Sequence, residues 1–289
     1  MKHLRYSDYT LLVAANKVLL QRIFYSGVII SFLLSYRFNI LVSQVGENPL
    51  ADQDADPVYL LFMITGIADF FKGWFAAFIE MLMMFCSIGA IVYPAKRLFP
   101  VSFLVMYFPY FITYNMVAGH HYTNTGLLIM ALPFVFGGSR FISAFTFCRF
   151  IFCFMMFTAA CWKIARGNLW HIDQTGMLLV NTSLHSLAAG VTDWHTELVR
   201  WLINHKPIAH MLWVILIVLE LLFAAGFVTL KWDKYLLIGY GLFFIGGWFL
   251  FNIYNFENLF FLNTLTPVLL LADGVRKLLP AANPGNKSL

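Results

Sequence analysis

Long apolar stretches, separated by short polar connections, dominate this chain of 289 residues. A membrane-spanning α-helix needs ~20 consecutive, mostly apolar residues, and windows of this kind recur along most of the sequence. They cover approximately residues 22–42, 74–94, 98–118, 122–138, 141–162, 207–230, 235–253 and 256–273. The pattern predicts an all-α fold, a polytopic transmembrane helical bundle of about eight spans.

Two further apolar stretches leave the number of membrane segments open. Residues 58–70 are short for a span and are followed closely by Lys72, so we favour an interfacial or re-entrant piece over a separate span. Residues 174–192 are only mildly apolar and are interrupted by Asn181 and His185. The sequence does not decide whether either stretch enters the membrane.

Nothing in the sequence marks a second domain. We find no linker, no low-complexity tract and no convincing internal repeat. We therefore expect one transmembrane helical domain over residues 1–279 and a short flexible tail over residues 280–289. Because inverted repeats are common in secondary transporters, their absence weakens a transporter interpretation.

The composition agrees with a chain whose main solvent is lipid. Hydrophobic residues make up 61% of the sequence and charged residues 11%, against ~25% charged in a typical soluble domain. The mean hydropathy is +0.76. These values exclude a soluble globular enzyme, a disordered chain and a nucleic-acid-binding module, and they leave membrane lipids as the expected surroundings.

The positions of the cations predict the orientation. Lysine and arginine gather in alternate connections, and positive charge in short loops marks the cytoplasmic side. The cations on this side are Lys2, Arg5, Lys17, Arg22, Lys96, Arg97, Arg140, Lys231, Lys234, Arg276, Lys277 and Lys287. The connections on the other side are longer and hold most of the acids. Both termini are therefore predicted to be cytoplasmic, and residues 38–73 and 163–206 to lie outside.

This topology places several polar residues at the outer ends of different spans. His120 and His121 follow the third span, Lys163 follows the fifth, and Asn252 ends the seventh. Polar groups at membrane depth cost ~2.5–3.5 kcal/mol each on insertion scales and often serve a function. Each of them also has a structural interpretation, as an interfacial side chain or as a hydrogen-bonding contact between helices.

Three ionisable residues lie inside predicted spans. They are Glu80, Arg149 and Glu220, and an ionised carboxylate in an apolar surrounding needs a partner or a proton. Arg149 is a candidate partner for Glu220, although the sequence alone does not show the contact. The histidines and cysteines lack metal-ligand spacing, so no metal site is expected.

Three stretches of the chain resemble segments of a known membrane family. They are GHHYTNTGLLIMALPF at 119–134, FTAACWKIARGNLW at 157–170, and residues 219–263, an apolar stretch with the acidic residue Glu220 near its start. In order and spacing, over roughly residues 20–273, the chain resembles the membrane region of the vitamin K-dependent gamma-glutamyl carboxylases. It is similar to their bacterial relatives, the horizontally transferred transmembrane (HTTM) family, and more distantly to DoxX-like membrane proteins. The first stretch has Gly-His where the family has Asn-His.

The resemblance implies a catalytic set. Lys163 matches the lysine that acts as the active-site base on reduced vitamin K in the carboxylases. His120 matches the family's histidine when Tyr122 is the anchor, and His121 matches it when Gly126 is the anchor. The implied cofactor is a quinone or quinol, and the implied location is a bacterial inner membrane.

Four further residues complete the predicted site. The resemblance matches Asn252 to an asparagine of the third stretch, and Tyr122, Trp162 and Trp170 lie beside the predicted catalytic residues. We expect these four to line an outward-facing pocket for a quinone-like or lipidic ligand. The carboxylases hold their peptide substrate with a large region after the spans, so we expect a ligand cavity here rather than peptide carboxylation.

Three functions remain in competition at this point. The first is a carboxylase-like or quinol-dependent membrane enzyme or ligand-binding protein that uses Lys163. The second is a non-catalytic membrane subunit that anchors or scaffolds an envelope complex, with the polar residues serving packing and subunit contacts. The third is a transporter or channel, which would need a continuous polar path across the membrane.

Overall fold

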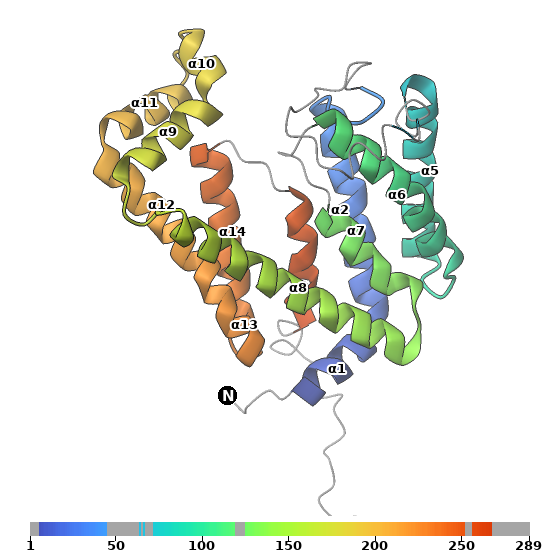
Figure 1. The fold of residues 1–289 in the computed structure, drawn as a ribbon. Helices are drawn as coiled ribbons and strands as arrows, with labels where there is room; N and C mark the ends of the chain where they lie inside the picture. Colours follow the sequence, from blue (N-terminus) through green and yellow to red (C-terminus); the bar gives the residue numbers. More distant parts are fainter. Residues whose placement is uncertain are drawn as a thin grey trace, which may run out of the picture.

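The computed structural model describes residues 6–44, 64, 66, 72–118, 125–251 and 256–267, and every element in these ranges is a helix (Figure 1). The order is α1 (Tyr6–Ala15), α2 (Lys17–Arg37), α5 (Gly73–Val92), α6 (Leu98–Ala118), α7 (Thr125–Ala131), η1 (Leu132–Val135), α8 (Gly138–Ala165), α9 (Ile172–Thr182), α10 (Leu184–Ala188), α11 (Trp194–Asn204), α12 (Lys206–Leu221), η2 (Leu222–Ala224), α13 (Ala225–Val228), α14 (Asp233–Phe251) and η3 (Phe256–Thr264).

Four segments in the described part of the chain are long and apolar enough to cross a membrane. They are Lys17–Arg37, Gly73–Val92, Gly138–Ala165 and Lys206–Val228. The last three agree with predicted spans within three residues, whereas the first begins and ends five residues before the predicted 22–42. The all-helical fold class is thus confirmed for the described residues, whereas the total of eight spans and the orientation of the termini remain predictions.

The other predicted spans give helices of more varied form. The window at 98–118 coincides with α6, and the window at 235–253 with α14. The window at 122–138 is described only from residue 125, and it divides into α7 and the short 3₁₀ helix η1, where Pro133 lies at the start of η1. The window at 256–273 begins with a nine-residue 3₁₀ helix rather than an α-helix.

The two ambiguous stretches have different outcomes. Residues 174–192 form most of α9 and all of α10, which are short helices separated by Ser183. The stretch at 58–70 lies outside the described residues apart from Ile64 and Gly66.

Helix α8 joins two groups of helices. Figure 1 shows α2, α5, α6 and α7 on one side of the molecule and α9 to α14 on the other, with α8 running obliquely between them. The N-terminal half of α8 packs in a core rich in aromatic side chains, where Phe145, Phe152 and Phe261 are fully buried. Phe152 stacks on Phe261 with ring centroids 5.2 Å apart. The buried rings thus tie α8 to η3.

The last turns of α8 belong to a second, smaller core. Ala160 of α8 packs there with Leu179 of α9, Val199 of α11 and Ile217 of α12, all of which are fully buried. Helices α9, α10 and α11 lie over the first half of α12, at the opposite end of the molecule from α1 (Figure 1). This layer holds the end of α8, and therefore Lys163, against α12.

Candidate functional site

Lys163 and Glu220 form an ion pair between α8 and α12. Lys163 lies in the last turn of α8, and Glu220 lies in the last turn of α12. The Glu220 side chain is 2% exposed and the Lys163 side chain 22% exposed. The carboxylate is therefore buried between the helices, while the lysine stays reachable from outside the protein.

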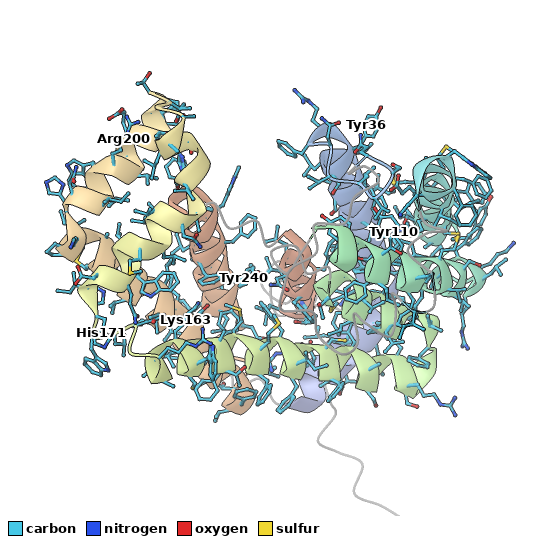
Figure 2. All side chains as sticks on the ribbon, turned by 45° about the horizontal axis from the view of Figure 1, so that its top comes forward. Tyr36, Tyr110, Lys163, His171, Arg200 and Tyr240 are labelled. Carbon is cyan, nitrogen blue, oxygen red and sulfur yellow. The ribbon has the colours of Figure 1, made fainter. Side chains whose placement is uncertain are left out.

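Two aromatic rings flank the lysine. The Nζ atom of Lys163 lies 5.1 Å from the ring centroid of Trp213 on α12 and 5.5 Å from that of Phe243 on α14. Cation–π contacts of this kind stabilise an ammonium group by about 0.5–2 kcal/mol. Figure 2 shows Lys163 at the end of α8, where that helix approaches the second group of helices. The head group of Lys163 therefore lies among one carboxylate and two aromatic rings.

The pair retains unused hydrogen-bonding groups. Glu220 Oε1 accepts the hydrogen bond from Lys163, whereas Glu220 Oε2 is buried and has no partner among the described residues. An ammonium group has three donors, and Glu220 is the one described residue that accepts from Lys163. The lysine can therefore still donate to an oxygen atom of a bound molecule.

Arg149 is not the partner of Glu220, so that hypothesis was wrong. Arg149 pairs instead with Asp233 at the start of α14: Nη2 lies 2.5 Å from Oδ1, and Nε lies 3.1 Å from Oδ2. Arg149 also donates to the backbone oxygens of Gly226 (2.7 Å) and Thr229 (3.4 Å). Both charged side chains are at most 1% exposed. The physical reason is the distance along α8. Arg149 lies fourteen residues, or about 21 Å, before Lys163, so it is beside the end of α13 and too far from Glu220 to pair with it.

Glu80 is occupied by the segment that follows α2. Its Oε1 accepts from Ser43 N at 3.1 Å and from the Tyr110 hydroxyl at 3.2 Å, and its Oε2 accepts from the Ser43 hydroxyl at 2.6 Å. The carboxylate is 6% exposed. These bonds use both oxygens within the protein, so Glu80 holds a chain segment rather than a ligand.

The two predicted tryptophans lie at the surface. Trp162 is 59% exposed and Trp170 is 74% exposed. Trp162 packs under the guanidinium of Arg166, with 4.4 Å between Cζ and the ring centroid. One ring beside Lys163 belongs to Trp213, which lies about two helical turns from Glu220 on α12. The structure therefore does not bring either predicted tryptophan into the lysine's immediate surroundings.

The remaining predicted site residues lie outside the described part of the chain. These are His120, His121, Tyr122 and Asn252. Their predicted place beside Lys163 stays a prediction.

Sequence reasoning missed Asp233, Trp213 and Phe243. Asp233 was hidden because it follows Lys231 and Trp232 and resembles an ordinary loop charge. Trp213 and Phe243 are apolar side chains in apolar helices, so composition gives no signal for them. These contacts depend on how α8 packs against α12 and α13. That antiparallel packing places Lys163 beside Glu220 of α12 and Arg149 beside Gly226 of α13.

Comparisons with known proteins leave the family of the chain open. No family of known proteins, no curated protein and no solved structure matches this sequence or its fold.

Proposed function

We propose that the protein is a multi-pass protein of a bacterial inner membrane that binds a lipophilic, quinone-like or lipidic molecule at the Lys163–Glu220 pair. The observation that carries the proposal is the state of this pair: a buried carboxylate holds a lysine that is 22% exposed and has donors to spare. Buried ion pairs seldom add stability over apolar packing, so their presence in an apolar helical protein needs another reason.

The chemistry of the pair favours an oxygen acceptor on the ligand. Lys163 would donate to a carbonyl, phenolate or phosphate oxygen, and Trp213 and Phe243 would contact the apolar part of the same molecule. Glu220 directs the lysine head group toward α12. Its second oxygen is a proton acceptor with no donor among the described residues, so the pair has the groups needed to hold a proton at Nζ or at Oε2.

The resemblance to the carboxylase and HTTM family supports the same residue. It assigns the role of base to the position of Lys163, and it implies a quinone or quinol as the partner. The proposal is therefore a ligand-binding site that is equipped for acid–base chemistry.

Mass spectrometry of the lipids and quinones that copurify with the protein tests this proposal. We expect one hydrophobic species to be enriched with the unchanged protein, relative to the membrane extract, and to be lost from Lys163→Ala. Lys206→Ala is the matched control, because Lys206 forms an exposed ion pair with Asp173 (2.6 Å) far from the site.

Two outcomes would contradict the proposal. One is an identical set of bound molecules with the unchanged protein and with Lys163→Ala, provided that both elute as the same folded species in gel filtration. The other is the absence of any enriched species from the unchanged protein. Copurification of a defined set of other membrane proteins in that case would favour the anchoring subunit.

A further inference from the structure

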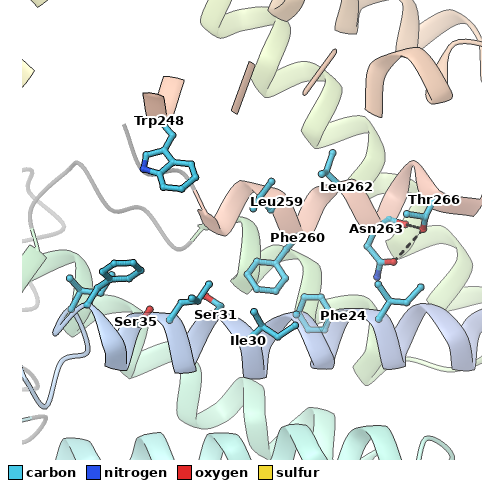
Figure 3. A pocket seen from close by; sticks show the side chains of 15 residues that line it. Phe24, Ile30, Ser31, Ser35, Trp248, Leu259, Phe260, Leu262, Asn263 and Thr266 are labelled. Carbon is cyan, nitrogen blue, oxygen red and sulfur yellow. Dashed lines mark hydrogen bonds between the residues drawn. The ribbon is translucent and has the colours of Figure 1, made fainter. Parts of the chain in front are cut away.

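A cavity lies away from the lysine site, on the side of α2. Its volume is about 520 Å³, and it is bounded by α2, by η3 with the residues just after it, and by Trp248 of α14 (Figure 3). Ligand pockets of ~300–1,000 Å³ are typical for small molecules and cofactors. The cavity is therefore large enough to hold a chain-like apolar group.

The cavity follows α2 along much of its length. Its lining on this helix runs from Ile23 to Phe38, which corresponds to about 22 Å at the rise of an α-helix. The hydrocarbon core of a bilayer is ~30 Å thick. Ile30 and Leu34 in the lining are 58% and 41% exposed, so the cavity opens sideways. Because α2 is one of the helices suited to cross a membrane, this opening would face lipid chains.

Polar groups are unevenly distributed along the cavity. At one end, Asn263 and Thr266 use their polar atoms within the protein: Asn263 Nδ2 donates to Leu20 O at 3.0 Å, and the Thr266 hydroxyl donates to Asn263 O at 2.8 Å. Toward the other end, Ser31 and Ser35 project from α2, as Figure 3 shows, and their hydroxyls bond to no other described residue. One end thus suits an apolar tail, and the other offers two donors.

The charge at the serine end matches this polarity. Arg37 occupies the last turn of α2 and is exposed. It follows Leu34 by three positions and Ile30 by seven, so it lies on the same face of the helix as the cavity lining. A guanidinium at the end of a spanning helix is placed to contact a lipid phosphate.

We propose that this cavity is a binding site for a glycerophospholipid, with one acyl chain lying along α2 beside Ile23 and Ile30 and against Phe260. An ester carbonyl accepts from the hydroxyl of Ser31 or Ser35, and the phosphate contacts Arg37. Water is a poor occupant because the lining is mainly apolar, and water needs two to four polar partners. This site is independent of the proposed function at Lys163.

Photolabelling with a phosphatidylcholine that carries a diazirine on its acyl chain tests the proposal on the full-length protein in detergent. We expect labelled peptides from α2 and η3, with labelling that saturates as lipid is added. Ser31→Trp fills the cavity and should lower this labelling about tenfold, which corresponds to about 1.4 kcal/mol. Leu34→Trp fills it from a more exposed position and should give the same loss. Arg37→Gln should raise the lipid concentration needed for half-saturation.

Leu33→Trp is the matched control, because Leu33 is 57% exposed on the same helix and does not line the cavity. Its labelling should equal that of the unchanged protein. Lys163→Ala should also leave the labelling unchanged, which separates this site from the lysine site. Labelling of α2 that rises linearly without saturation, or an equal loss with Leu33→Trp and Ser31→Trp, would overturn the proposal.

Discussion

Arg149 and Asp233 form the most enclosed charged contact among the described residues. The guanidinium binds both carboxylate oxygens and two backbone oxygens, and it lies 5.8 Å from the ring centroid of Tyr9 on α1. Tyr9 in turn donates to Thr264 O at 2.7 Å. One side chain therefore joins α8, the end of α13, the start of α14 and α1.

We expect Asp233→Ala to destabilise the protein by about 3–5 kcal/mol, because it leaves a buried guanidinium without its counter-charge. Arg149→Met should have a similar effect, because it strands the carboxylate. The double variant Arg149→Met with Asp233→Leu should be less destabilised than either single variant, since no buried charge remains. Thermal unfolding of the detergent-solubilised protein measures all three; additive losses in the double variant would contradict this account.

Asp193 caps α11. Its carboxylate makes the stability of this helix depend on pH. Its Oδ1 accepts from His195 N and Thr196 N, both at 2.9 Å, and its Oδ2 accepts from the Thr196 hydroxyl. The hydrogen bonds from Thr196 lower the pKa of the carboxyl below its usual value. The stabilisation is therefore complete above the unfolded-state pKa of about 3.9, and it is lost as the pH falls through the lower folded-state pKa.

Hydrogen exchange of the first amides of α11 measures this effect. We expect protection, corrected for intrinsic exchange, to hold at pH 5 and to fall in acid below the pKa of a free aspartate. Asp193→Asn is the matched control, because asparagine also caps helices but does not titrate. Protection that falls equally in both proteins would assign the acid effect to another group.

At the scale of elements, α5 fastens the end of α2 through one carboxylate. The Glu80 carboxylate accepts hydrogen bonds from the backbone N–H and the hydroxyl of Ser43. The hydroxyl of Tyr110 on α6 donates to the same carboxylate and accepts from Val42 N at 3.3 Å. Two helices and the segment that follows α2 therefore meet at a single group. Leu41 and Val42 of the same segment are also buried in the main core, so Glu80 adds a polar anchor to an apolar one.

We expect Glu80→Ala to release this segment, while Glu80→Gln should keep part of the contact through its carbonyl oxygen. A cysteine introduced at Ser43 would destroy one of the bonds, and Asn39 has a left-handed backbone (φ 56°) and accepts a hydrogen bond from Gln44. The reporter is therefore better placed as Ile40→Cys, because Ile40 is half-buried and becomes more exposed if the segment is released. Its reaction rate with a soluble thiol reagent should be highest with Glu80→Ala and intermediate with Glu80→Gln. Equal rates in all three backgrounds would show that Glu80 does not hold the segment.

Hydrophobic windows predict the helices well, and they predict contacts between helices poorly. The windows at 74–94 and 98–118 agree with α5 and α6 within two residues, because lipid requires every backbone group to be bonded within its own helix. The window at 122–138 did not predict that a 3₁₀ helix begins beside Pro133. The pairing of Glu220 with Lys163 rather than Arg149 depends on how far α8 and α12 overlap, which no single helix encodes.

At the scale of the whole molecule, the polar contacts between helices show in which direction neighbouring helices run. Gln21 donates to Ala90 O at 3.0 Å near the start of α2, and Ser43 meets Glu80 beyond its other end. In α8, Arg149 near the middle of the helix contacts Gly226, and Lys163 in the last turn contacts Glu220, so the partner positions run backward along the chain. Helix α2 is therefore antiparallel to α5, and α8 is antiparallel to the segment formed by α12 and α13. Antiparallel neighbours are expected for helices that cross a membrane in succession.

Combined with the cation distribution, this alternation predicts which end faces the cytoplasm. Lys231, between α13 and α14, should be inside, and Thr192, between α10 and α11, should be outside; both are exposed. In intact cells, a membrane-impermeant thiol reagent should modify Thr192→Cys and should modify Lys231→Cys only after permeabilisation, with the unchanged protein as the control for its own cysteines. Labelling of both positions from one side would remove a membrane crossing between them, and reversed labelling would overturn the predicted orientation. Since Lys163 precedes the layer that contains Thr192, the same result decides whether its ligand arrives from the outer half of the membrane.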